Sequence, residues 1–108
     1  MATVTTHVLD SARGRPASGV GVRLQSADGA EIAAGRTDDD GRITDLAPSE
    51  LGAGAYRLVF DTGGYFAATG QSGFYPEVVI AFTVDDPAEH YHVPLLLAPF
   101  AYSTYRGS

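Results

Sequence analysis

The sequence predicts an all-β protein built as a sandwich of short strands. Eight segments of three to nine residues alternate apolar and polar side chains with the period of two that a half-buried strand requires. Turn residues separate these segments throughout and include two Asp-Gly pairs, which are typical of tight hairpin turns. Many short strands with turns at this spacing indicate two packed β-sheets.

The first half of the chain supplies four of these strands. In the first, valines alternate with a row that contains His7, whereas residues 11–18 contain Gly and Pro and are expected as a loop. Gly29 and Gly41 each follow an aspartate and close hairpin turns. The four strands are expected at 3–10, 20–26, 31–37 and 42–44. The first strand carries Val4, Thr6 and Val8 on one side and Thr5, His7 and Leu9 on the other, and the second is expected to bury Val20, Val22 and Leu24.

The second half supplies the remaining four strands and one short helix. A loop is expected at 48–54, and the helix at 63–70 is rich in alanine and bracketed by glycine. Tyr65 and Phe66 are expected to hold this helix against the sandwich. The four strands are expected at 55–61, 77–84, 90–98 and 100–105. The inward rows of the first two are Tyr56, Leu58 and Phe60, then Val78, Ile80, Phe82 and Val84.

Length and composition narrow the classes of function. A chain of 108 residues predicts a single domain spanning 1–108. The absence of cysteine excludes disulfides and thiolate metal sites and suits a reducing compartment. The N-terminal residues lack a signal peptide pattern and no window is apolar enough to span a membrane, so we expect a cytoplasmic protein. A net charge of −6 argues against nucleic acid or an anionic membrane as a partner.

The segment 90–108, HYHVPLLLAPFAYSTYRGS, holds most of the candidate functional residues. In a strand, His90, His92, Pro94 and Leu96 share one face, while Tyr91, Val93, Leu95 and Leu97 form a core row on the other. A face that combines two imidazoles with apolar side chains is unusual for a surface that meets only water. The chain then ends in Tyr105, Arg106, Gly107 and Ser108, directly after the last expected strand.

Each candidate also has an ordinary structural interpretation. His7 and His92 are individually typical of hydrogen-bonded structural histidines, although an imidazole is also the side chain best suited to accept a proton near neutral pH. Arg42 follows a turn and is typical of a solvated strand end, but a guanidinium also binds carbonyl oxygens of a flat ring through paired hydrogen bonds. His90 and His92 have chelating spacing, yet no third ligand is evident, so we predict no metal. The residues alone leave Ser108 a weak nucleophile, since no supporting motif surrounds it.

The run HYHVPLLL and the closing Tyr-Arg-Gly-Ser resemble the 5-hydroxyisourate hydrolases, the transthyretin-related enzymes of urate breakdown. The resemblance extends over nearly the whole chain. It implies two four-stranded sheets with the helix between the fifth and sixth strands. It also implies an active site lined by the catalytic residues His7, Arg42, His92 and Ser108. His7 and Arg42 would also bind substrate, together with Tyr105, Arg106 and Gly107, while His90 is taken as structural.

The same resemblance implies an activity and an assembly. The activity is hydrolysis of 5-hydroxyisourate to 2-oxo-4-hydroxy-4-carboxy-5-ureidoimidazoline in purine degradation, without a cofactor. The assembly is a homotetramer, a dimer of dimers, with active sites where subunits meet. Exposed apolar residues often mark such an interface, and Pro94, Leu96 and Phe100 are expected to need cover.

Two other functions fit the sandwich. One is a transthyretin-like carrier of a small ligand, against which two histidines and an arginine in an apolar cleft argue. The other is a structural β-sandwich module, which residues 19–43 suit but which gives the C-terminal segment no purpose.

Overall fold

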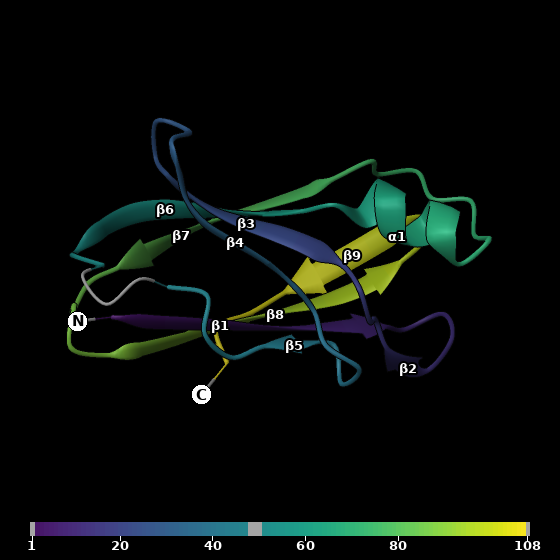
Figure 1. The fold of residues 1–108 in the computed structure, drawn as a ribbon, viewed down its shortest axis with the longest axis horizontal. Coiled ribbons are helices and arrows are strands. Elements are labelled where there is room, and N and C mark those ends of the chain that lie inside the picture. The colour runs from purple at the N-terminus through teal and green to yellow at the C-terminus, as the bar shows by residue number, and fades with distance from the viewer. Residues whose placement is uncertain (1, 48–50, 108) are drawn as a thin grey trace.

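Two β-sheets packed face to face form the protein (Figure 1). The structure is a computed structural model that describes residues 2–47 and 51–107, with overall dimensions of 39 × 26 × 19 Å. Its elements are β1 (Thr3–Asp10), β2 (Arg15–Pro16), β3 (Gly21–Ser26), β4 (Glu31–Arg36), β5 (Arg42–Ile43), β6 (Gly54–Phe60), α1 (Thr62–Ala68), β7 (Val78–Val84), β8 (His90–Ala98) and β9 (Ala101–Thr104).

The first sheet is centred on β1 and β8, which run parallel although they lie at opposite ends of the sequence. Its path is β2-β1-β8-β9, and the two-residue β5 also pairs with β1. The second sheet has the order β4-β3-β6-β7 and is antiparallel throughout. In Figure 1 the second sheet lies above the first, and α1 covers the end of the sandwich where β6 finishes.

The predicted sandwich is confirmed, with small differences in its strands. Every expected strand is present, and the bounds predicted for β1 and β8 are those observed. The loop predicted at 11–18 contains the additional strand β2, because Leu9 and Asp10 pair with Arg15 and Pro16. The first sheet therefore has five strands rather than four. The loop predicted at 48–54 falls partly outside the described residues, and its last residue begins β6.

The core lies between the sheets and follows the alternation of the sequence. Tyr91, Val93, Leu95 and Leu97 of β8 are all buried, as predicted. Leu58 and Phe60 are also buried, whereas Tyr56 and Phe82, predicted inward, are only half-buried at the margin of the core.

Helix α1 is held in place as expected, since Tyr65 and Phe66 are buried against the sandwich. Asp61 caps its N-terminus by accepting a hydrogen bond from the Gly64 N–H. At seven residues the helix is short, and within residues 2–47 and 51–107 no helix has the length and apolar character needed to cross a membrane.

The apolar residues expected to need cover behave differently from one another. Pro94 is already buried within the single chain, which corrects that expectation, because the C-terminal Gly107 packs beside it. Leu96 is half-buried and Phe100 is 70% exposed.

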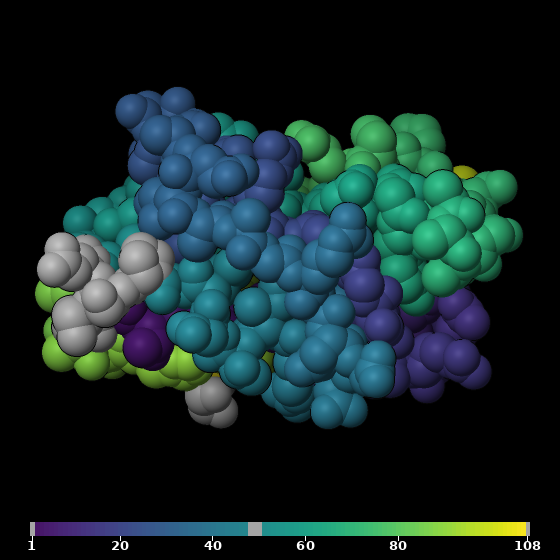
Figure 2. Space-filling view, viewed as in Figure 1, coloured from purple at the N-terminus to yellow at the C-terminus, as the bar shows by residue number. Residues whose placement is uncertain are grey.

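Figure 2 shows a different face of the molecule, which is covered by the β3–β4 hairpin, the segment around β5 and helix α1.

Candidate active site

Strands β1, β5 and β8 bring three of the predicted residues onto the outer face of the first sheet. His7 of β1 lies directly opposite Arg42 of β5, so both side chains project from the same face. Thr5 is paired with His92 of β8 and shares the side of β1 that carries His7. The opposite row of β1, which includes Val4, is buried in the core, so the face with the imidazoles is the outer one.

The turn before β5 places Arg42 at this position. Gly41 has a φ of 74°, a left-handed conformation that favours glycine. A Cβ atom there would lie 2.4 Å from the carbonyl oxygen of Val8, so only glycine allows the turn to approach β1 so closely. The backbone N–H of Val8 donates to the Gly41 oxygen at 2.7 Å, and Asp38 accepts a hydrogen bond from the Arg42 N–H. The guanidinium of Arg42 is left exposed at the edge of the face.

A polar hollow of about 180 Å³ opens on this face. Its lining comes from the three strands already described and from the residues just after β5. The lining residues are Thr5, Thr6, Arg42, Thr44, His90 and His92. An imidazole, a guanidinium and hydroxyl groups thus surround one small space, which provides a proton acceptor, a cation for negative charge and neutral hydrogen-bonding groups.

His92 is fixed in orientation from two sides. Its Nδ1 forms a hydrogen bond of 2.7 Å with the Thr5 hydroxyl. The backbone of Gly107 lies against the ring edge, where an added Cβ would come within 2.5 Å of the His92 Cδ2. Nε2 makes no hydrogen bond to any described residue, so this nitrogen remains available for a ligand or water.

The environment of His92 favours its neutral form. Burial lowers the pKa of the imidazole below its ordinary value of 6.5, and the positive charges of Arg42, His7 and His90 lower it further. A hydrogen bond with the Thr5 backbone acts weakly in the opposite direction. Near neutral pH the ring is therefore an unprotonated base held next to a guanidinium.

The C-terminal residues divide between two surfaces. Gly107 joins the outer face, because its N–H donates to the His92 oxygen at 2.9 Å in an antiparallel bridge. Arg106 instead turns toward the inner row, where its guanidinium lies 4.5 Å from the centre of the Tyr91 ring and 3.9 Å from a Glu89 oxygen. Tyr105 is 60% exposed.

Tyr105 and Arg106 line a second hollow, of about 300 Å³, together with His92 and residues 80–83 of β7. Within the single chain Arg106 therefore shares a hollow with His92 but does not line the polar hollow that contains Arg42. Ser108, the remaining predicted site residue, lies outside the described residues.

The sequence of the chain matches a known family almost from end to end. Residues 4–107 match the model of the HIUase/Transthyretin family. The chain belongs to this family. A 5-hydroxyisourate hydrolase of Caulobacter vibrioides is 48% identical over the full length of both chains. A 5-hydroxyisourate hydrolase of Mus musculus is 44% identical, over 97% of this chain and 94% of the relative.

Solved structures of HIUase/Transthyretin proteins have the same fold. The 5-hydroxyisourate hydrolase of Klebsiella pneumoniae superposes with a TM-score of 0.90 at 40% identity, covering 98% of this chain and 99% of its own. Sea bream transthyretin in complex with thyroxine superposes with a TM-score of 0.89 at 33% identity, covering 97% and 94%. Because the hydrolase and the transthyretin fit equally well, the fold alone does not separate these two members of the family.

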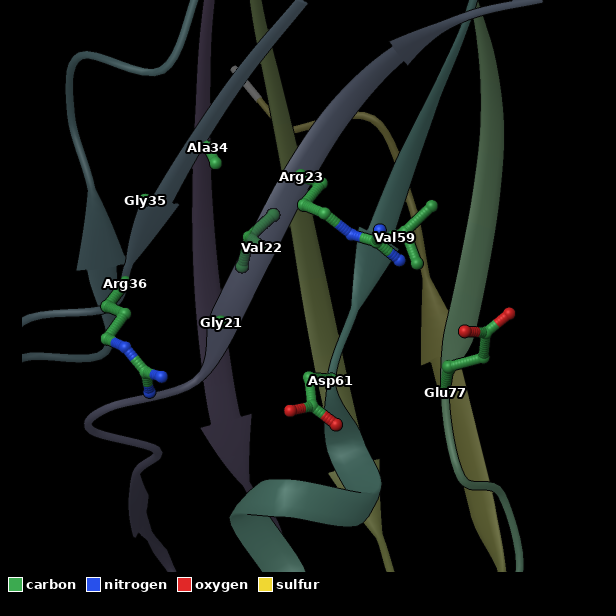
Figure 3. A pocket seen from close by; sticks show the side chains of 9 residues that line it. All are labelled: Gly21, Val22, Arg23, Ala34, Gly35, Arg36, Val59, Asp61 and Glu77. Atoms are coloured by element: carbon green, nitrogen blue, oxygen red, sulfur yellow. The ribbon is translucent and has the colours of Figure 1, made fainter. Parts of the chain in front are cut away.

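A third hollow, larger than the two just described, lies away from the histidine cluster on the outer face of the second sheet. It measures about 490 Å³, and Figure 3 shows Arg23, Arg36, Asp61 and Glu77 around it. Two guanidiniums and two carboxylates line it without a histidine, a hydroxyl or a thiol. It therefore offers charge but neither a base near neutral pH nor a nucleophile, and it is not the candidate active site.

Three residues of the site were not identified from the sequence. Thr5 contacts His92, and Thr6 and Thr44 also line the polar hollow. Threonine is common in strands, so none of the three stands out by type. The signal for Thr5 was its position two residues before His7, which places both on one face.

For a metal, the described part of the chain contains no group of three or more His, Cys, Asp or Glu side chains placed to hold an ion.

Proposed function

We propose that this chain is a 5-hydroxyisourate hydrolase, which opens the six-membered ring of its substrate to a ureidoimidazoline carboxylate during urate degradation. The observation that carries the proposal is the placement of His7, Arg42 and His92 on one face, where Arg42 and His92 line a polar hollow. Relatives that bear this enzyme name and are 42–48% identical support it. The catalytic unit is the single domain 1–108, and a cytoplasmic location is part of the proposal.

His92 is the general base in this scheme. The reaction requires a water to lose a proton as it attacks the lactam carbonyl, and a neutral imidazole is suited to accept it. The lowered pKa of His92 keeps it neutral at physiological pH, and its Nε2 makes no hydrogen bond to a described residue. His7, on the same face, is assigned to proton shuttling with His92.

Arg42 stabilises the negative charge that develops on the carbonyl oxygen. A guanidinium donates two parallel hydrogen bonds to oxygens of a planar ring, and its charge is most effective in the transition state. Its exposure at the edge of the hollow leaves it free to bind a ligand.

The C-terminal residues complete the site in this proposal. Gly107 supports the His92 ring, and Tyr105 contacts the substrate from the adjoining hollow. Arg106 and Ser108 are assigned to the site on the family resemblance alone, Arg106 to substrate binding and Ser108 to orienting the water or an imidazole. No cofactor enters the scheme.

A homotetramer, arranged as a dimer of dimers, is the proposed active assembly. The outer face that carries the site also carries the half-buried Leu96, and Phe100 beyond it is 70% exposed. A second subunit placed over this face would cover these apolar groups and enclose the hollow. The sites would then lie where subunits meet.

The direct test adds the purified protein to a urate oxidase reaction and follows the transient ultraviolet absorbance of 5-hydroxyisourate. We expect the intermediate to decay faster in proportion to the protein added. Decay at the spontaneous rate would refute the proposal. Decay at the spontaneous rate combined with thyroxine binding would instead identify a carrier of the transthyretin type.

A further inference from the structure

A continuous chain of hydrogen-bonding groups leads away from the candidate base. The Thr5 hydroxyl lies 2.7 Å from His92 Nδ1 and 3.0 Å from His90 Nε2. The other nitrogen of His90, Nδ1, lies 2.5 Å from the Thr3 hydroxyl. The parallel pairing of β1 and β8 produces this row, because Thr3 is opposite His90 and Thr5 is opposite His92. The row runs from the half-buried His92 to the exposed His90 and Thr3.

The Thr5 hydroxyl allows only two arrangements of protons. It has one hydrogen, so it donates to one imidazole and accepts from the other when both rings are neutral. If Thr5 donates to His90, it accepts from Nδ1–H of His92, and His92 Nε2 carries a free lone pair. If Thr5 donates to His92, then His92 Nε2 carries the proton and is no longer a base.

We propose that Thr3, His90 and Thr5 form a proton relay that holds His92 in the tautomer with Nε2 unprotonated and carries the proton it accepts to solvent. Thr5 and His90 are then positioning residues for His92. The inference rests on the proposed hydrolase function, since it names the exit for the proton that the reaction releases.

One turnover of the relay balances every proton. His92 Nε2 takes a proton from the attacking water, and the Nδ1 proton of His92 passes to the Thr5 oxygen. The Thr5 hydroxyl proton passes to His90 Nε2, the His90 Nδ1 proton to the Thr3 oxygen, and the Thr3 hydroxyl proton to bulk water. The net result is one proton moved from the attacking water to solvent, with no change of charge on the relay.

After this transfer each hydrogen bond in the row points in the opposite direction, which suits the second half of the reaction. His92 then carries its proton on Nε2 and acts as the acid that protonates the leaving nitrogen. Loss of that proton lets the row return to its starting arrangement by taking one proton back from solvent at Thr3. The carboxylic acid formed by ring opening ionises near neutral pH, so the overall reaction still releases one proton.

Two features of the pair of histidines support this use. Their rings are stacked, with centres 6.5 Å apart and planes inclined by 14°. Two positive imidazoles this close repel one another, so the pair favours holding at most one extra proton, as a relay requires. The lowered pKa of His92 means that it passes such a proton on rather than keeping it.

The first experiment reads the tautomer of His92 by two-dimensional ¹H–¹⁵N NMR of the substrate-free protein at pH 8. We expect the wild type to show Nδ1 protonated and Nε2 unprotonated. In His90→Phe the Thr5 hydroxyl loses its acceptor and donates to His92 Nδ1, so the proton should move to Nε2. A purely structural role for His90 predicts no such inversion. A wild-type ring already protonated at Nε2, or an unchanged tautomer in His90→Phe, would overturn the proposal.

The second experiment compares kcat for Thr5→Val and Thr5→Ser, which differ in the hydroxyl. Thr5→Val loses part of the general-base contribution of about 10²–10⁴, so we expect kcat to fall at least about tenfold while KM changes less. Thr5→Ser keeps the hydroxyl and should recover most of the rate. Thr69→Val, which removes a half-buried, hydrogen-bonded hydroxyl just after α1, is the matched control. A Thr5→Ser enzyme as slow as Thr5→Val would contradict the relay.

The two experiments separate the relay from the function on which it rests. The NMR measurement needs no substrate, so it decides the tautomer even if the protein leaves 5-hydroxyisourate untouched. An active wild type with an unchanged tautomer in His90→Phe removes the relay and leaves the hydrolase.

Discussion

His92 is held in a fixed orientation and kept neutral by its surroundings. Its ring is held by the Thr5 hydroxyl on one edge and by the Gly107 backbone on the other. Burial and the charges of Arg42, His7 and His90 all disfavour the imidazolium. A base that is both oriented and neutral needs no rearrangement before it accepts a proton, which is the condition that general-base catalysis sets.

The lowered pKa of His92 determines how activity depends on pH. The imidazole must be unprotonated to act, so kcat/KM should be constant around pH 7 and fall as pH drops through a pKa below 6.5. Arg42→Ala removes a positive charge, so in that variant the acid limb should move upward toward 6.5. Rates measured from pH 5 to 8 test this, and a wild-type limb centred above 6.5 would contradict it.

The lowered pKa of His92 also makes the free energy of unfolding depend on pH. Between the folded pKa of His92 and 6.5, the unfolded chain binds more protons than the folded one. The contribution of this group therefore makes the free energy of unfolding rise with pH across that window, and it is constant above it. Asparagine at position 92 does not titrate and removes this contribution.

Gly107 allows a test of ring orientation without removing any functional group. A methyl group at this position would lie 2.5 Å from His92 Cδ2, so the ring must move in Gly107→Ala. We expect kcat to fall by at least about tenfold, because misplacement of a reacting group by about 1 Å costs on the order of 10²-fold. Thermal unfolding should change little, since Gly107 joins the sheet only through an isolated bridge to His92. Unchanged turnover would show that the tail does not support the ring.

At the level of residues, the family resemblance predicted the members of the cluster but not their contacts. Taken alone, His7, Arg42 and His92 were each typical of a structural or solvated residue. The contact of Arg106 with the Tyr91 ring depends on how the C-terminal segment lies against β8, and the sequence Tyr-Arg-Gly-Ser does not indicate this. Likewise, the Thr5 contact depends on the register of two strands about 85 residues apart, which alternation within one strand does not determine.

Among the elements, β1 links the active face to the only helix of the described chain. Its last residue, Asp10, is buried and accepts hydrogen bonds from the Tyr65 hydroxyl at 2.6 Å and from Gln71 at 3.1 Å. Burial alone would raise the pKa of Asp10, but these bonds and one from the Arg13 N–H lower it overall. Burial and the same contact raise the pKa of Tyr65 to about 12.

Tyr65→Phe should therefore destabilise the fold while leaving catalysis intact. It removes a donor from a buried carboxylate, and the loss of such a partner costs about 1–3 kcal/mol of unfolding free energy. Tyr56→Phe removes a comparable bond, to the Gly52 oxygen at 2.8 Å, but at an exposed site, and should cost less. Denaturant unfolding of both variants gives the comparison. Equal losses of unfolding free energy in the two variants would show that the buried contact to Asp10 stabilises the fold no more than the exposed one.

Asp10 also predicts how the element responds to acid. Because its folded pKa is lowered, its stabilising contribution is present above the unfolded pKa of about 3.9 and is lost as pH falls through the folded value. The Tyr65→Phe protein has a weaker contribution, so its stability should depend less on pH in the acid range.

Element boundaries were predictable where alternation is long and buried. The strands β1 and β8 have eight and nine residues with one buried row each, and their bounds were predicted correctly. Strand β2 consists of two exposed residues, Arg15 and Pro16, in the connection between β1 and β3. Its formation depends on pairing with Leu9 and Asp10 rather than on its own sequence, so local pattern did not indicate it.

For the whole molecule, the parallel pairing of β1 with β8 places residues from both ends of the sequence on one face. The antiparallel pairing of β5 with β1 adds Arg42. Alternation predicted which rows are buried and that a sandwich forms, but it does not determine which strands are neighbours. The family resemblance implied two four-stranded sheets, and the structure agrees with it apart from the additional short strand β2.

The proposed assembly can be tested by placing a charge on the outer face of the first sheet. In Leu96→Arg, a charge is added to the outer face beside the site, and we expect subunits to separate because burying an unpaired charge at an interface is costly. Activity should be lost although His7, Arg42 and His92 are intact. Ala34→Arg adds the same charge to the outer face of the second sheet and is the control. Light scattering with an activity assay tests this, and a fully active monomer would end the assembly proposal.

The measurement that tests the central claim most directly is kcat/KM for 5-hydroxyisourate in three single variants of folded protein. His92→Asn and Arg42→Ala should each lower it by at least about 10²-fold, the lower end of what a positioned base or an oxyanion donor contributes. Arg23→Ala removes an equally exposed guanidinium from the opposite sheet and should retain wild-type values. Wild-type kinetics in His92→Asn or Arg42→Ala would contradict the assignment of the active site to this face.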